Sequence, residues 1–359
     1  MHHASVSFEI VAGCEQKCAH CYNVWKGPDA EPTGRISTAS YKEVMTKALV
    51  GSRTRRAVLT GGEPTNHPDF LALAAHARSL VPRLGIITNG NRLESLAPSL
   101  GRLGTTSVQV TLLAAHAGRH DELKGDTGSF ERTIRGAVAC FEQNVEVVVC
   151  FVCTPENWQE FPGVLEIAAA LGVRMVSFNR ASPSGWGVTR LPQIVAEPAM
   201  VIAGLEAAER AYRTWGIRTK AAIPIPPCVV EYERYPSVEL GFCGVGRGGQ
   251  EFAIDPAGKV RSCNLSSTRM ADLCTDEWTD AEASPYLRQF VAALPEECVG
   301  CRHAKTCGGG CKEGGFAAYG KLGAVDPFVR LARTGSAATT DAHSSDIKPR
   351  RRLPVLASA

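Results

Sequence analysis

Three closely spaced cysteines near the amino end carry the strongest chemical signal in the sequence. Cys14, Cys18 and Cys21 are separated by three residues and then by two. Thiolates so close in sequence reach one centre only if the chain curls around it, and such thiolates hold iron–sulfur clusters. No fourth cysteine lies nearby, so one iron of a 4Fe–4S cube would be left for a ligand from outside the protein. Zinc, which also binds thiolates, is the alternative occupant.

A second segment suited to ligand binding follows the second expected strand. It reads Gly61, Gly62, Glu63 and Pro64. Glycines let the backbone approach a ligand closely. A turn that presents carbonyl groups and a carboxylate is suited to binding an ammonium group.

These two motifs, in this order, resemble the radical S-adenosylmethionine (SAM) superfamily. The C-x3-C-x2-C spacing and His20 just before the last cysteine carry the resemblance. It implies that the open iron chelates the amino and carboxylate groups of SAM. An electron from the cluster would then cleave SAM to a 5′-deoxyadenosyl radical. The Gly-Gly-Glu-Pro segment would bind the SAM amino group, and His20 would lie beside the adenine.

Weaker motifs follow in the order typical of the family. Thr88 and Asn89 end the third expected strand, where the family often places polar contacts to SAM. Thr111 ends the fourth and would meet the ribose or carboxylate. The segment His120-Asp-Glu-Leu-Lys-Gly125 is similar to one common in the branch with extra clusters, and Arg132 beyond it would neutralise the SAM carboxylate. For each single residue here, a helix cap or a salt bridge is an equally good interpretation.

Short β-branched runs alternate with helix-length segments over the first half of the chain and would position these motifs. Such alternation predicts an α/β fold with a parallel sheet and right-handed crossovers. The family resemblance implies a partial (β/α)6 TIM-type barrel, with the site at the C-terminal ends of the strands. The expected strands are residues 5–11, 57–60, 84–88, 107–112, 145–152 and 174–178. The expected helices are residues 38–50, 69–80, 92–103, 129–143, 158–171 and 198–215.

A second group of cysteines occupies the last third of the chain. Its spacing, including Cys298-x2-Cys301-x5-Cys307-x3-Cys311, is similar to that of the SPASM domain, which in its full form holds two auxiliary 4Fe–4S clusters. The pattern implies that Cys243, Cys263 and Cys311 hold the first auxiliary cluster. It implies that Cys298, Cys301 and Cys307 hold the second.

The chain departs from that pattern at its end. A full SPASM domain has one more cysteine, often just after an Asp-Pro pair, whereas no cysteine follows Cys311 here. The second auxiliary cluster would therefore be completed by Asp326, another donor, an exogenous ligand or the substrate, or would be labile or absent. For the first auxiliary cluster, Cys228 is the candidate fourth ligand and Cys274 is its rival.

Composition and domain organisation fit a metalloprotein of ordinary character. We expect a radical SAM core over residues 1–222, a SPASM-like auxiliary domain over 223–330 and a disordered tail over 331–359. The net charge of +3 gives no reason to expect nucleic acid or membrane as a partner. We find no secretory signal and no apolar run long enough to span a bilayer. Fourteen cysteines without a signal indicate metal ligands in the cytoplasm, where thiols stay reduced.

The combined motifs predict an enzyme that oxidises its substrate at carbon. The leading hypothesis is oxidative modification of a ribosomal peptide or protein side chain, by cross-linking or dehydrogenation. The alternative is dehydrogenation of a small-molecule alcohol such as a sugar or cyclitol. A third class, an electron carrier or zinc scaffold, has no need of the Gly-Gly-Glu-Pro segment. Expected partners are a one-electron reductant such as flavodoxin or ferredoxin and a separate leader-peptide-binding protein. No general base is assigned.

Overall fold

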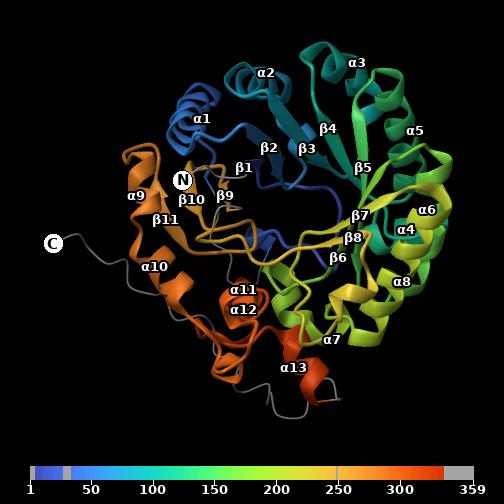
Figure 1. The fold of residues 1–359 in the computed structure, drawn as a ribbon. Coiled ribbons are helices and arrows are strands. Elements are labelled where there is room, and N and C mark those ends of the chain that lie inside the picture. Colours follow the sequence, from blue (N-terminus) through green and yellow to red (C-terminus); the bar gives the residue numbers. More distant parts are fainter. Residues whose placement is uncertain (1–4, 27–33, 248–249, 335–359) are drawn as a thin grey trace.

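Six parallel strands in chain order form the centre of a curved sheet. The computed structural model describes residues 5–26, 34–247 and 250–334. Each neighbouring pair of the six strands is parallel, and the sheet curls into a partial barrel (Figure 1). This confirms the predicted α/β fold, and each strand begins and ends within two residues of the expected bounds. The strands are β1 (Ser5–Val11), β2 (Arg56–Gly61), β3 (Arg83–Thr88), β4 (Ser107–Thr111), β5 (Glu146–Cys153) and β6 (Met175–Arg180).

Helices cover the outer face of this sheet (Figure 1). Their apolar faces pack against the strands, and side chains such as Met45, Leu73 and Leu100 are fully buried in one continuous core. The six expected helices are confirmed, whereas α4 is an addition to them. The outer helices are α1 (Thr38–Ser52), α2 (Phe70–Leu80), α3 (Leu93–Leu103), α5 (Ser129–Glu142), α6 (Phe161–Ala170) and α8 (Pro198–Trp215), while α4 (Ala117–Lys124) contacts α5 and lies inside this arc.

The sheet continues beyond both edges of this six-stranded centre. On one side β7 (Arg218–Ala221) and β8 (Val238–Leu240) add parallel strands after β6. On the other side β9 (Glu251–Ile254) pairs in parallel with β1. Two short antiparallel strands, β10 (Lys259–Arg261) and β11 (Arg269–Asp272), follow it. The segment expected as a second domain thus extends the same sheet of eleven strands.

The remaining elements are short helices between the two ends of the outer helical arc (Figure 1). The last helix, α13 (Pro327–Thr334), reaches into the range predicted as a tail. It continues to Thr334, and its residue Leu331 is buried against the core. That range is therefore helical at its start, because the apolar face of this helix is buried there; residues 335–359 lie outside the described residues. These helices are α9 (Trp278–Glu282), α10 (Pro285–Ala292), α11 (Ala304–Cys307), α12 (Lys312–Tyr319) and α13 (Pro327–Thr334); the short helix α7 (Leu191–Ile194) precedes α8 in the chain.

Two buried ion pairs fasten this later segment to the strands. Arg180, the last residue of β6, donates to Asp326, and both side chains are at most 1% exposed. Glu9 of β1 accepts from Arg261 of β10, again with both side chains buried. Buried charges are costly unless they are paired, so each pair fixes where the later segment sits.

One pair of helices has, taken together, the length and composition of a membrane-spanning segment, but the two helices are not collinear. Within the described ranges, no single helix is long and apolar enough to cross a bilayer. The segments Gly187–Ile194 and Pro198–Trp215 meet that criterion only together, and they are bent by 72° to each other.

Candidate functional site

The loop after β1 carries the three amino-terminal cysteines at the carboxyl end of the sheet. Cys14, Cys18 and Cys21 are all free and half-buried. The Cys21 amide donates to the Cys18 carbonyl at 3.2 Å, which closes a tight turn between them. Their thiols therefore belong to one short curled segment, as the spacing predicts.

The Gly-Gly-Glu-Pro turn lies directly against this loop. The Gly62 amide donates to the Val11 carbonyl at 2.7 Å, and the Glu63 amide donates to the Gly13 carbonyl at 2.8 Å. A Cβ on Gly62 would lie 2.1 Å from the Gly13 carbonyl oxygen, so only glycine permits this approach. The two motifs that the sequence separates by about forty residues thus form one surface.

The three thiols of the cysteine loop are the type of donor that holds iron–sulfur clusters. In the part of the chain that the structure describes, no group of three His, Cys, Asp or Glu side chains is placed to hold a single metal ion. Burial raises the pKa of the Cys14 thiol to about 11 and raises that of Cys21 as well. These two thiols are protonated without metal, so cluster binding must release their protons.

Glu63 joins the ends of two strands. Its side chain is 1% exposed, and its Oε1 atom accepts bonds from Thr65 and from the Thr88 hydroxyl at 2.7 Å. Its Oε2 atom accepts from the Asn89 amide at 2.7 Å. Burial raises the pKa of Glu63, although these donors oppose the shift. Glu63 therefore positions Thr88 and Asn89, and its contact with SAM stays a prediction.

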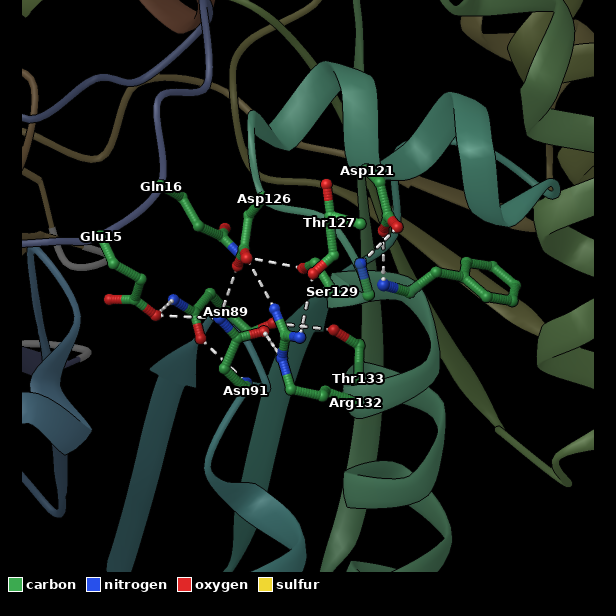
Figure 2. A network of polar contacts seen from close by, with 12 residues as sticks. Glu15, Gln16, Asn89, Asn91, Asp121, Asp126, Thr127, Ser129, Arg132 and Thr133 are labelled. Atoms are coloured by element: carbon green, nitrogen blue, oxygen red, sulfur yellow. Dashed lines mark hydrogen bonds and ion pairs between the residues drawn. The ribbon is translucent and has the colours of Figure 1, made fainter.

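Glu15 organises a group of amides beside the cysteine loop (Figure 2). Its carboxylate accepts bonds from Asn66 at 2.7 Å, from Asn89 at 2.6 Å and from Asn91 at 3.0 Å. Burial disfavours the charged form, but these donors lower the pKa of Glu15 overall. The sequence places Glu15 between Cys14 and Cys18, a signal that could have singled it out.

Asp126 is the second anionic centre of the same network (Figure 2). It accepts bonds from Gln16 at 3.0 Å, from Asn91 at 2.7 Å and from Arg132 at 2.6 Å. Arg132 also donates to Asn91 at 3.2 Å and to the Thr127 carbonyl at 3.0 Å. The guanidinium is thus engaged within the protein, while its predicted contact with the SAM carboxylate stays a prediction. Sequence reasoning missed Gln16, Asn91 and Asp126.

The His120–Gly125 segment docks the cysteine loop from the other side. The Lys17 amide donates to the Lys124 carbonyl at 2.8 Å. Burial, together with the charge of Lys124, lowers the pKa of His20 to about 3, so its imidazole is neutral. Thr111 ends β4 opposite Cys150 of β5, on the same edge of the sheet as Thr88.

The later cysteines form two groups. In the first, burial raises the pKa of the Cys243, Cys263 and Cys311 thiols, which also lie close enough for the charge of one thiolate to raise the pKa of another. The Ser182 hydroxyl, just beyond β6, donates to the Cys311 sulfur at 3.3 Å. A Cβ on nearby Gly185 would lie 2.3 Å from the Asn23 carbonyl oxygen. The loop after β6 therefore lies between the amino-terminal cysteine loop and this group.

The second group lines a pocket with four cysteines. Cys298, Cys301 and Cys307 share it with Cys228. Cys228, expected as a ligand of the first group, lies instead in this pocket, beside Pro226 and Pro227. Its rival Cys274 is exposed and lies beside Ala257, 3.7 Å from that carbonyl oxygen.

Asp326 is used for structure. One of its oxygens accepts from Arg180 and, at 2.7 Å, from the Cys311 amide. The other accepts from the Phe328 amide at 2.9 Å. Because both oxygens are engaged and the side chain is fully buried, the carboxylate stabilises the packing of α13 against β6.

Comparison with known proteins agrees with this arrangement. Residues 8–168 match the Radical SAM superfamily. A PqqA peptide cyclase of Xanthomonas euvesicatoria pv. vesicatoria is 26% identical over 334 residues, which cover 90% of this chain and 86% of the relative. A PqqA peptide cyclase of Methylocella silvestris is also 26% identical, over 339 residues, with the same coverage.

Solved structures share the fold. SuiB of Streptococcus suis, bound to its precursor peptide SuiA, superposes with a TM-score of 0.69 at 15% identity, over 87% of this chain and 72% of SuiB. The structure named anSMEcpe with bound AdoMet superposes with a TM-score of 0.66 at 15% identity, over 92% of this chain and 95% of that one. The cysteine loop and the Gly-Gly-Glu-Pro turn both lie within residues 8–168, the part of the chain that matches the Radical SAM superfamily.

Proposed function

We propose that this chain is a radical SAM oxidoreductase that modifies a ribosomally made peptide, by forming a cross-link or a double bond. The observation that carries the proposal is the packing of the cysteine loop against the Gly-Gly-Glu-Pro turn. Relatives named for cyclisation of the peptide PqqA align over 90% of the chain, which favours a peptide as substrate.

Residues of this chain would hold and orient the cofactors. Cys14, Cys18 and Cys21 would hold the cluster, and the turn around Glu63 would face SAM. When bound, the cluster and SAM supply a carbon radical that removes hydrogen from an unactivated C–H bond, and the auxiliary clusters supply an electron acceptor. Glu15 and Asp126 keep the loop and the strand ends in one arrangement, so that the bound groups need not reorganise the protein.

The proposal extends to partners and place of action. A one-electron reductant such as flavodoxin or ferredoxin would feed the amino-terminal cluster. A separate leader-peptide-binding protein would present the precursor. The chain would work in the cytoplasm, where its many thiols stay reduced.

The test uses the full chain, reconstituted anaerobically with iron and sulfide. It is incubated with SAM, a reductant and short precursor peptides encoded beside its gene. We expect one peptide to lose a pair of hydrogen atoms, measured by mass spectrometry, with release of 5′-deoxyadenosine. A Cys18→Ala variant is the matched control and leaves the peptide unchanged. Oxidation of a sugar or cyclitol alcohol, with every peptide left intact, contradicts the proposal.

A further inference from the structure

The pocket with four cysteines differs from the other two cysteine sites in the number of its thiols. Cys228 comes from the segment after β7, whereas Cys298, Cys301 and Cys307 come from the region between α10 and α12. All four cysteines line the same pocket, together with Pro226, Pro227 and Gly309.

The approach of Cys228 to this pocket is fixed by the barrel. The amides of Val229 and Val230 donate to the Pro226 carbonyl at 2.9 and 3.2 Å, which forms a turn around Cys228. Arg180 at the end of β6 donates through Nε to the Pro224 carbonyl at 2.8 Å. The same guanidinium pairs with Asp326, which in turn accepts from the Cys311 amide. The buried Arg180 guanidinium therefore links the Cys228 segment to the Cys307–Cys311 segment.

The sulfur atoms in this pocket have the amide donors that thiolates use. The His303 amide donates to the Cys301 sulfur at 3.4 Å. The amides of Gly309 and Gly310 donate to the Cys307 sulfur. Hydrogen bonds of this kind to cysteine sulfurs tune iron–sulfur clusters. No carboxylate lines the pocket, since its other lining residues are Pro226, Pro227, His303, Ala304, Gly309, Val329 and Arg333.

We propose that Cys228 is the fourth thiolate of an auxiliary iron–sulfur cluster held by Cys298, Cys301 and Cys307. It takes the place of the cysteine that this chain lacks after Cys311, and it reaches the pocket from the amino-terminal side of the group. The first auxiliary group, on Cys243, Cys263 and Cys311, is then left with three thiolates. The assignment concerns cluster ligands and does not depend on which substrate the enzyme modifies.

The first experiment tests cluster membership by combining substitutions. In a full-length background with Cys14, Cys18 and Cys21 replaced by Ala, only the auxiliary clusters remain. There, Cys228→Ala is expected to lose up to about four irons per chain, or to change the electron paramagnetic resonance signal of the reduced protein. Adding Cys228→Ala to Cys298→Ala removes no further iron, because both residues serve one cluster. Adding Cys228→Ala to Cys263→Ala removes iron from both auxiliary groups.

A second experiment needs no variant to fold. Cys228 and Cys274 are both exposed, so an alkylating reagent reaches both in the cluster-free protein. In the anaerobically reconstituted protein we expect Cys228 to be protected and Cys274 to stay reactive, as mapped by mass spectrometry of the peptides. Equal alkylation of the two, or further iron loss when Cys228→Ala is combined with Cys298→Ala, overturns the assignment. Zinc in place of iron in this pocket overturns it too.

Discussion

The amino-terminal cysteine loop and the later cysteine groups bring their thiols together in different ways. The loop takes all its thiols from eight consecutive residues, Cys14 to Cys21, after one strand. The later groups gather thiols from segments that are far apart in the chain, from Cys228 to Cys311. Local spacing organises the first site, whereas buried ion pairs and close backbone packing organise the others.

This difference implies that the sites fail independently. The loop depends on the sheet and on the polar network around Glu15 and Asp126. The later groups depend on Arg180 and Asp326, which lie outside that network. With the clusters placed as we propose, substitutions would remove iron from the later cysteine groups while leaving the amino-terminal cluster in place, and the reverse.

The largest effect is expected from breaking the buried ion pair. Arg180→Ala leaves the Asp326 carboxylate buried without its partner, which lowers the free energy of unfolding by about 3–5 kcal/mol. The control is Lys220→Ala, because Lys220 pairs with Glu239 at 3.1 Å with both side chains about half exposed. That pair is worth at most about 1 kcal/mol.

Denaturant unfolding and iron analysis of both variants provide the measurement. Arg180→Ala should also lose auxiliary iron and keep iron on the amino-terminal loop. Equal stability of the two variants, or loss of iron from the loop first, contradicts the division of the molecule into two independently held sites.

A smaller effect is expected from crowding the same junction. Gly310 has φ +86°, and a Cβ there would lie 2.6 Å from an Asp326 oxygen. Gly172 has φ +75° with no atom near its Cβ position. The backbone conformation alone costs either Ala variant about 1–2 kcal/mol. Gly310→Ala should lose more stability than Gly172→Ala, because it also displaces Asp326. Thermal unfolding measures both losses. Equal losses would contradict the role of Asp326 at this junction.

The smallest effect is expected in the amino-terminal network. Arg132 pairs with Asp126 at 2.6 Å, and the two side chains are 32% and 18% exposed. Arg132→Ala should raise the dissociation constant for SAM about fivefold, equivalent to about 1 kcal/mol, by loosening Asn91 and Gln16. Arg135→Ala on the same helix is the control, because its pair with Glu94 is exposed.

Isothermal titration of the reconstituted protein measures this constant. A loss of about a hundredfold for Arg132→Ala would instead indicate direct contact with the SAM carboxylate, as the family motif predicts. Auxiliary iron should be the same in both variants, since neither residue touches the later cysteine groups.

The sequence predicts the barrel well because two signals can be read locally. They are the hydrophobic periodicity and the Gly and Pro residues at the ends of helices and strands. The expected helix at residues 198–215 agrees with α8 at both ends. The later strands were not predicted, because β8 and β10 have only three residues each and owe their existence to neighbouring strands. Likewise the spacing identifies Cys298, Cys301 and Cys307 as one group, but only the tertiary turn at Pro226 shows where Cys228 lies.

The pairing of residues in the polar network around Glu15 and Asp126 could not be predicted from the sequence either. Glu15 and Gln16 lie inside the cysteine motif, and Asn91 lies just beyond Thr88 and Asn89. Their roles depend on partners such as Asp126, more than thirty residues away from Asn91. Residue type and position mark such groups as candidates, while their pairing is set by the way the strand ends meet.

The most direct measurement is the reductive cleavage of SAM by the anaerobically reconstituted chain and two of its variants. The account predicts 5′-deoxyadenosine from the unchanged chain, none from Cys14→Ala, and continued release from Cys228→Ala, whose site is separate. Release of 5′-deoxyadenosine by Cys14→Ala, or zinc on the amino-terminal loop of the unchanged chain, would contradict it.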